Sequence, residues 1–491
     1  MPRTLEPGGQ RQVTAGSGRQ ASPGGKPPTR DTPGWKNLLA LISLALSALL
    51  WLNGLAESLS RPSVGGDLNL RQLELAALAH QALPSRLQPL LAGADPEKAL
   101  QQALSQSLTN SAEAGERPVA DLRLELALLQ QRRGEVGEAR TLLQELANEA
   151  NDPAIAPYSA VAQQLLNTPR EPSTTGSTWA EQRPILRLWI CESIRNNAAA
   201  TSCNAAAIAR RAAGQLLAVT LVPGLVLLAG IALLLRQLWL QWRGRAARPA
   251  PLVGPSLQGL DAVLLIAGGF VVIGELLTPV VVNPLLSELL RRLAVESPLR
   301  EGLTVVAMYL ALMAGPLLIL AWMLRSLGAA PEGGWLQYRW RPLPVAAAGA
   351  IQALLLVLPL VSFVGWLQGQ IWDDPGGSNP LLDLVLRSHQ PAALACFALT
   401  AVVLAPIFEE TIFRGVLLPV VARDLGGLWG VVISALVFAV AHLSLGELPP
   451  LFMLGLGLGW LRWRSGSLGS CVLMHALWNG LTFSNLVILG S

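Results

Sequence analysis

Residues 406–414 read PIFEETIFR and place two adjacent glutamates, Glu409 and Glu410, inside a long apolar run. A carboxylate at bilayer depth costs on the order of several kcal/mol unless it is paired or hydrated, so an acid in such a run indicates a functional site. Packing alone does not account for two carboxylates with Arg414 four residues further on. The stretch therefore predicts a membrane-embedded helix beside a polar, water-holding cavity.

The composition of the whole chain supports a membrane protein. Of its 491 residues, 52% are hydrophobic and 14% are charged, whereas an average soluble domain has roughly 25% charged residues. The net charge of +4 is mild and sits largely in short loops. Basic loops beside apolar spans are more typical of membrane orientation than of nucleic-acid binding, so nucleic acid is not an expected partner.

The predicted fold class is all-α, a polytopic transmembrane helical bundle of about 8–9 spans with a small helical extramembrane insert. Each span needs roughly 20 apolar residues. The first anchor covers 35–55, further transmembrane helices fill 215–366, and a final bundle of four runs occupies 390–490, at 391–421, 426–443, 449–463 and 467–489.

Two further segments lie outside these spans, one at the start of the chain and one nearer the C-terminus. Residues 1–33 are basic and rich in Pro and Gly, with almost no large apolar side chains, and predict a disordered tail. Basic residues before the first span and few after it place the N-terminus in the cytoplasm. Nearer the C-terminus, Asp373–Gln390 has the composition of a polar loop.

The polar segment 56–213 has helical periodicity and is expected to lie outside the cytoplasm. Its stretch 120–150 predicts two amphipathic helices around Arg133-Gly134, an arrangement that resembles one tetratricopeptide-like hairpin. Cys191 and Cys203 lie in this segment, either as unrelated thiols or as a disulfide that an oxidising compartment would preserve. The insert is a candidate site for a protein partner.

Three polar clusters interrupt the last four apolar runs. They are Glu409-Glu410-x-x-x-Arg414, Phe438-x-x-x-His442 and His475-x-x-x-Asn479. Glu410 and Arg414 share one helical face and are expected to pair. Glu409 points about 100° away and is free for another task.

The depth of these clusters follows from their distance to the turns. Glu409 lies 15 residues before Asp424, and His442 lies 16 residues after Gly426. At about 1.5 Å per residue, both sit about 22–24 Å from the same membrane edge, so antiparallel helices would bring them to one level. His475 lies only eight residues after Ser467, which predicts a shallower position unless a short or partly re-entrant loop at 443–450 lowers it.

These residue types fit hydrolysis. A glutamate can hold and deprotonate a water molecule, and histidine or asparagine donors can stabilise the oxyanion of an attacked carbonyl. Glu409, His442 and His475 could instead ligate a divalent metal such as Zn, which would lower the pKa of bound water. The zincin spacing His-Glu-x-x-His does not occur.

Structural interpretations compete for each residue taken singly. Asn479 alone is typical of a hydrogen bond between helices, and Phe438 of packing. Glu275, in another span, is either an acid at a helix interface or, together with Glu409, part of a proton-coupled transporter. His80 and His389 lie in polar segments and are not expected to be catalytic.

The ordered set of three motifs resembles the CPBP family of intramembrane proteases, which includes type II CAAX prenyl endopeptidases and bacterial bacteriocin-processing and lysostaphin-resistance-like relatives. The resemblance covers about residues 390–490 and implies peptide-bond hydrolysis near the membrane surface. It implies that Glu409 activates water with His442, that His475 and Asn479 form the oxyanion site, and that Arg414 buttresses Glu410. It leaves open whether a metal takes part.

The leading hypothesis is therefore a multi-pass membrane endopeptidase of the bacterial plasma membrane. Its expected partners are the lipid bilayer and a peptide or protein substrate, which the resemblance allows to be lipidated. The alternative is a membrane scaffold or bacteriocin self-immunity protein that acts through the insert at 56–213.

Overall fold

The computed structural model describes residues 33–61, 64–113, 120–153, 155–167, 183–194, 203–245, 249, 252–372 and 377–490. Within these ranges the regular elements are all helices, so the predicted all-α class is confirmed. The tail predicted at 1–33 lies outside the described residues except for its last position.

Seven helices of the described ranges are long and apolar enough to cross a membrane. The chain is therefore a multi-pass membrane protein. The seven are α1 (Gly34–Ser58), α9 (Ala205–Trp242), α12 (Leu299–Arg325), α13 (Leu343–Ile371), α20 (Leu468–Gly490) and two composite helices, Gly259–Arg292 and Pro391–Leu425.

Each composite helix contains π-helical turns. The first joins α10 (Gly259–Val263), π-helical η3 (Leu264–Leu277) and α11 (Thr278–Arg292). The second joins α15 (Pro391–Ala398), η4 (Leu399–Leu404), α16 (Ala405–Glu410), η5 (Thr411–Leu417) and α17 (Leu418–Leu425). π-Helical turns widen the helix locally and are frequent at functional sites. Here η4 and η5 flank the short α16 that carries both glutamates.

The predicted count of eight or nine spans exceeds the seven because two of the predicted runs form helices that are not among the seven candidate spans. α18 (Gly427–Val440) has only 14 residues, and α19 (Leu448–Ser465) contains Arg462 and Arg464 in its last turn. α19 packs inside the bundle, where it contacts α13, α18 and α20. Protein covers the apolar residues of α19, whereas α18 exposes Leu428, Trp429 and Leu436.

Glycines allow the close packing of α19 against its neighbours. A Cβ at Gly455 would come within 3.0 Å of Ala435 on α18, and a Cβ at Gly457 would come within 2.1 Å of Val357 on α13. Small residues at helix contacts let backbones approach closely in membranes. The alternating glycines of α19 therefore place its backbone next to two helices at once.

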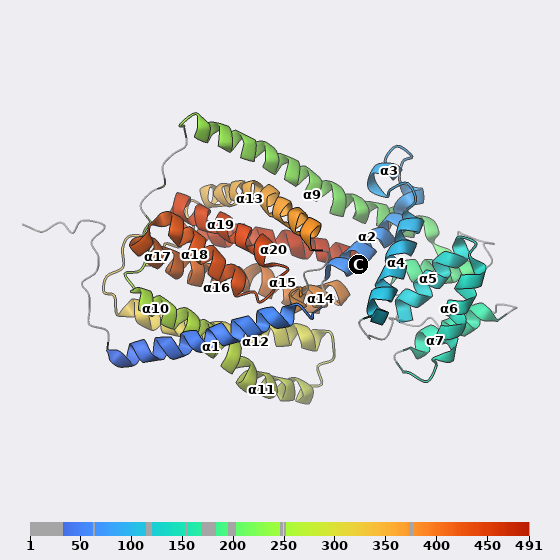
Figure 1. Cartoon of the computed structure of the whole chain (residues 1–491), viewed down its shortest axis with the longest axis horizontal. Coiled ribbons are helices and arrows are strands. Elements are labelled where there is room, and N and C mark those ends of the chain that lie inside the picture. Colours follow the sequence, from blue (N-terminus) through green and yellow to red (C-terminus); the bar gives the residue numbers. More distant parts are fainter. Residues whose placement is uncertain are drawn as a thin grey trace, which may run out of the picture.

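The bundle is wrapped by the two most N-terminal spans (Figure 1). α9 lies along α13 on one side, and α1 lies along η3 on the other. The Trp51 indole on α1 donates a hydrogen bond of 3.1 Å to Glu275 on η3. Glu275 thus has a partner across a helix interface, as expected if it is a structural acid at that interface.

The insert is a separate helical unit at one end of the bundle (Figure 1). Its helices surround one apolar core. They are α2 (Val64–Ala79), η1 (His80–Ala82), α3 (Gln88–Leu91), α4 (Pro96–Glu113), α5 (Ala120–Arg132), α6 (Val136–Asn148), α7 (Ala156–Leu166) and α8 (Pro184–Ile194). α5 and α6 form the hairpin expected around Gly134, which adopts a φ of +85°; its tetratricopeptide character stays a prediction. Cys191 and Cys203 form a disulfide.

Two sequence boundaries differ from the structure. The second span was expected to start near residue 215, but α9 starts at Ala205 because Ala212, Ala213 and Leu216 are buried in the core of the insert. The expected polar loop at 373–390 contains α14 (Pro380–Arg387), whose start is capped by the Asn379 side chain, which accepts a hydrogen bond from the Leu381 amide. Residues 373–376 of that loop lie outside the described ranges.

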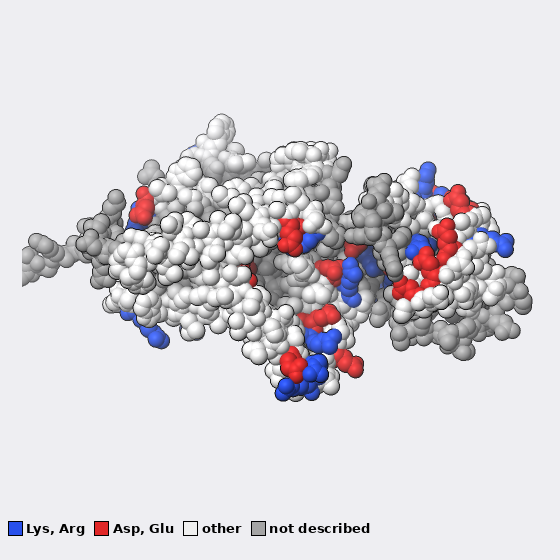
Figure 2. All heavy atoms as spheres, turned by 60° about the horizontal axis from the view of Figure 1, so that its bottom comes forward, with Lys and Arg blue, Asp and Glu red and all other residues white. Residues whose placement is uncertain are grey.

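The charged residues mark the ends of the bundle. Figure 2 shows a broad surface over the bundle that carries almost no charge, with Lys, Arg, Asp and Glu gathered on the insert and at the bundle ends. An uncharged band bounded by charged ends is what a bilayer requires of a protein surface.

Candidate active site

The two glutamates of α16 point in different directions, as their spacing predicts. Glu410 is fully buried, and its Oε1 accepts a hydrogen bond of 2.9 Å from the Arg414 guanidinium, which is also fully buried. Arg414 donates a second bond of 3.1 Å to the Gly455 carbonyl and lies 4.3 Å from the centre of the Phe438 ring. Removing one partner of such a buried pair costs about 3–5 kcal/mol, because the other charge is left uncompensated.

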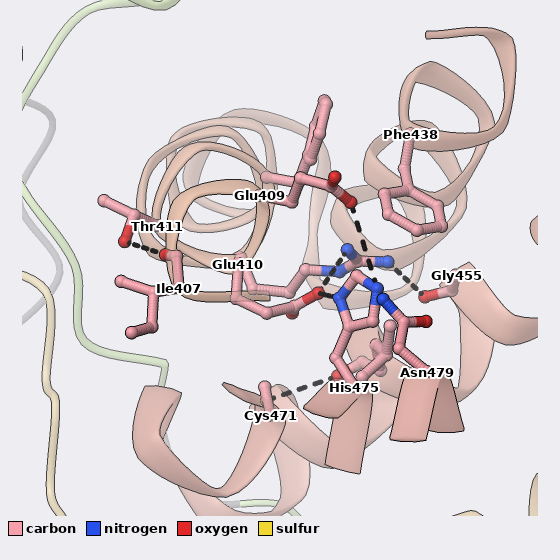
Figure 3. Close-up of polar contacts among 12 residues, drawn as sticks. Ile407, Glu409, Glu410, Thr411, Phe438, Gly455, Cys471, His475 and Asn479 are labelled. Atoms are coloured by element: carbon pink, nitrogen blue, oxygen red, sulfur yellow. Dashed lines mark hydrogen bonds and ion pairs between the residues drawn. The ribbon is translucent and has the colours of Figure 1, made fainter. Parts of the chain in front are cut away.

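His475 of α20 joins this pair. Its Nδ1 lies 2.9 Å from Glu410 Oε1. Since a carboxylate accepts only, Nδ1 donates, and Nε2 is directed toward Glu409, whose Oε2 is 3.9 Å away. Figure 3 shows the imidazole of His475 between the carboxylates of Glu409 and Glu410.

His442, which follows α18, has the same orientation toward Glu409. Its Nδ1 lies 2.8 Å from the Phe438 carbonyl oxygen, so Nδ1 donates there. Its Nε2 lies 4.0 Å from Glu409 Oε2. Two imidazole Nε2 atoms therefore face the same carboxylate oxygen at a separation that direct hydrogen bonding does not span.

Glu409 is held by a tyrosine of a distant helix. The Tyr309 hydroxyl on α12 donates a hydrogen bond of 3.1 Å to Glu409 Oε1. Glu409 Oε2 has no hydrogen-bond partner among the described protein atoms, and the side chain keeps 16% of its surface exposed. One oxygen is thus anchored, and the other is open toward the two histidines.

Asn479 lies one helical turn after His475 on the same face of α20 (Figure 3). Its amide nitrogen donates a hydrogen bond of 2.8 Å to the Ala401 carbonyl in η4. An amide group has two N–H donors, so one donor and the side-chain oxygen remain for a ligand.

The predicted shallow position of His475 is wrong. Its Nε2 reaches Glu409 as closely as His442 does. The reason is that α20 starts beneath loop 326–342: the Leu468 amide donates to the Gln337 carbonyl, and the Ser467 hydroxyl donates to the Arg339 carbonyl. Counting residues from a turn fails where the turn itself is buried.

Sequence reasoning missed two groups of this site. Tyr309 is one of only three tyrosines, and its hydroxyl in an apolar helix was an available signal. The Gly455 carbonyl gave no signal, because any residue supplies a carbonyl; only the close approach of α18 and α19 brings it to Arg414.

The metal assignment finds no support in the geometry. Among the described residues, no group of three or more His, Cys, Asp and Glu side chains is arranged to hold a metal ion. The metal-ligand role expected for Glu409, His442 and His475 therefore stays a prediction.

Two family models match parts of this chain. Residues 391–481 match the family described as type II CAAX prenyl endopeptidase Rce1-like. This match confirms, for the C-terminal part, the protease family recognised from the motifs. Residues 65–214, which span the insert, match a domain of unknown function, DUF8675.

One curated relative is similar over a short stretch. An uncharacterized 24.3 kDa protein of Escherichia coli is 43% identical over 82 residues, which make up 16% of this chain. The match spans about 38% of the length of that relative. No solved structure matches this chain.

Proposed function

Since residues 391–481 form an Rce1-like domain of the CAAX-type intramembrane protease family, we propose that this chain is a membrane endopeptidase in which Glu409 activates the attacking water. The observation that carries the proposal is the convergence on Glu409. One carboxylate oxygen is anchored by Tyr309, while the other has no hydrogen-bond partner among the described protein atoms and faces two imidazoles.

A water molecule fits the chemistry of this opening. With Nδ1 protonated, His442 presents a lone pair on Nε2, and Glu409 Oε2 presents another. A water that donates one hydrogen to each acceptor is held with its oxygen lone pairs directed away from them. Separations of about 4 Å are too long for a direct hydrogen bond and suit bridging by water.

The reaction follows from this arrangement. The water oxygen attacks the peptide carbonyl carbon while Glu409 takes a water proton. The carbonyl oxygen becomes an oxyanion that His475 Nε2–H and the second N–H of Asn479 stabilise. His475 does so in the form protonated on both nitrogens, with Nδ1–H directed at Glu410. Glu409 then gives its proton to the leaving amine, and the carbon–nitrogen bond breaks.

In the membrane orientation that we propose, the N-terminus lies in the cytoplasm and the insert lies outside it. Basic residues before α1 support this orientation. The Cys191–Cys203 disulfide supports an oxidising compartment for the insert.

The decisive experiment compares membrane-protein fragments from cells that express the wild-type chain or Glu409→Gln. The matched control is Glu288→Gln on α11, which makes the same chemical change at a carboxylate that, among the described residues, pairs only with Arg291 and Arg292 of its own helix. We expect new protein termini with the wild type and the control and none with Glu409→Gln. Identical fragments from all three would refute the proposal and favour a scaffold that acts through the insert. If a chelator abolishes cleavage and added Zn restores it, a metal ion takes part in the reaction.

A further inference from the structure

A pocket of about 180 Å³ lies where the insert meets the C-terminal end of α20. Its walls come from α2, the start of α8, the start of α9, the link between α14 and α15, and the last residues of α20. The charged and titratable lining residues are Arg71, Glu74, Arg183, Arg187, Arg211 and His389. This lining is separate from the Glu409 site and contains the histidine that the sequence left without a role.

Two of the four arginines are already paired within the insert. Arg183 contacts Glu74 at 2.6 Å, Asp121 at 2.6 Å and Glu125 at 2.5 Å. Arg71 contacts Glu74 at 3.0 Å. These carboxylates hold both guanidinium groups in place at the wall of the pocket.

The other two arginines, Arg187 and Arg211, are exposed and form no ion pair with any described residue. The four arginines therefore outnumber Glu74 and the two carboxylates behind the wall, Asp121 and Glu125. Burial raises the pKa of Glu125 to about 8, so the positive surplus grows at neutral pH. The pocket is suited to an anion.

The size and the position of the pocket narrow the choice of anion. Pockets for drug-sized ligands measure about 300–1,000 Å³, so this pocket admits a single compact group. It lies at the ends of α9 and α20, two of the candidate membrane spans. Apolar residues complete its wall, namely Leu75, Leu78, Ile208 and Leu489. Lipid headgroups lie at this level of a membrane protein.

We propose that this pocket binds the phosphate of an anionic phospholipid headgroup. Guanidinium groups bind phosphate oxygens in pairs and are more weakly hydrated than ammonium groups, so an arginine cluster favours phosphate. Basic pockets between membrane helices bind anionic headgroups. A phosphate here contacts the insert and the end of α20 together, and it fixes the insert to the edge of the Rce1-like domain.

Lipid binding by the purified full chain tests this proposal. Phosphatidylglycerol and phosphatidylcholine are titrated in a neutral detergent, and the bound lipid is counted by native mass spectrometry. We expect one phosphatidylglycerol to bind at least about tenfold more tightly than phosphatidylcholine, because both present a phosphate but the arginines repel the choline cation that makes phosphatidylcholine neutral overall. In Arg187→Gln/Arg211→Gln that preference is lost.

The matched control is Arg140→Gln/Arg210→Gln, which removes the same charge from exposed arginines outside the pocket. We expect it to keep the wild-type preference. Equal loss in both double variants would overturn the proposal, as would equal binding of the two lipids by the wild type. Displacement of phosphatidylglycerol by millimolar inorganic phosphate would also overturn it, by identifying a soluble phosphate as the ligand. The single variant Arg211→Gln repeats the test if the double variant does not fold.

Discussion

Two buried clusters of carboxylates and arginine lie in different regions of this molecule. In the insert, Arg183 contacts each of three carboxylates within 2.6 Å. In the bundle, Arg414 is taken by Glu410. No arginine of the described residues forms an ion pair with Glu409, and two imidazole Nε2 atoms lie 3.9 and 4.0 Å from its Oε2.

This difference distinguishes the Arg183 cluster, which stabilises the insert, from the Glu409 site, where we propose that hydrolysis takes place. Where every acid reaches a guanidinium directly, these contacts cross-link α2 and α5 to the segment that enters α8. Where one acid is left without such a partner, its carboxylate is available to a proton or a water molecule. Uncompensated acids in membrane-embedded helices are costly, and they mark functional sites for that reason.

The largest expected effect is on catalysis. Replacing Glu409 by Gln keeps the shape and removes the base, so the cleavage rate is expected to fall by about 10²–10⁴-fold. Its thermal unfolding in detergent should match that of the wild type, because no ion pair with arginine is lost. A variant that loses activity only in proportion to a fall in melting temperature would place Glu409 with the stabilising acids.

The next largest effect is on stability. Arg414→Gln leaves Glu410 buried without its partner and is expected to destabilise the bundle by about 3–5 kcal/mol. Arg183→Gln is expected to cost less, because Glu74 keeps its contact with Arg71 and the Asp121 side chain is 18% exposed and can be hydrated. The fully buried Glu125 has a raised pKa, which favours its neutral form. Hydrogen exchange of the intact chain measures each region separately. Greater loss of protection in the insert than in the bundle would reverse the comparison.

A smaller effect is expected from the group that anchors Glu409. Tyr309→Phe removes one hydrogen bond to a carboxylate, worth about 1.5–3 kcal/mol, and should lower kcat by roughly tenfold or more with little change in KM. Tyr158→Phe, in α7 of the insert, is the matched control and should leave kcat unchanged. Tyr309 acts as a positioning residue, so a change confined to KM would contradict this role.

The smallest effect is a pH dependence confined to the insert. Burial raises the pKa of Glu125 from 4.5 to about 8, so the folded insert binds this proton more tightly than the unfolded chain does. The resulting stabilisation is complete below about pH 4.5 and is lost as the pH rises through about 8. The slope is at most about 1.4 kcal/mol per pH unit for one proton.

Glu125→Gln is expected to flatten that profile, whereas Glu145→Gln, at an exposed position of α6, should preserve it. The measurement is the melting temperature of the full chain between pH 5 and pH 9. A wild-type profile that rises with pH across this window would show that Glu125 is held ionised, as an acid of an ordinary salt bridge is.

The sequence by itself determined the seven long apolar spans, the helical insert and the pairing of Glu410 with Arg414, because these depend on hydropathy and on spacing along one helix. It also determined which polar residues interrupt the apolar runs. The tertiary structure decided which of them meet. His475 reaches Glu409 because the start of α20 is buried beneath Gln337 and Arg339. Tyr309 and Gly455 join the site because α12 and α19 pack beside the helices that carry Glu409 and Arg414. Distances between helices depend on how side chains and glycines pack across their contacts, and residue spacing along a single chain does not contain that information.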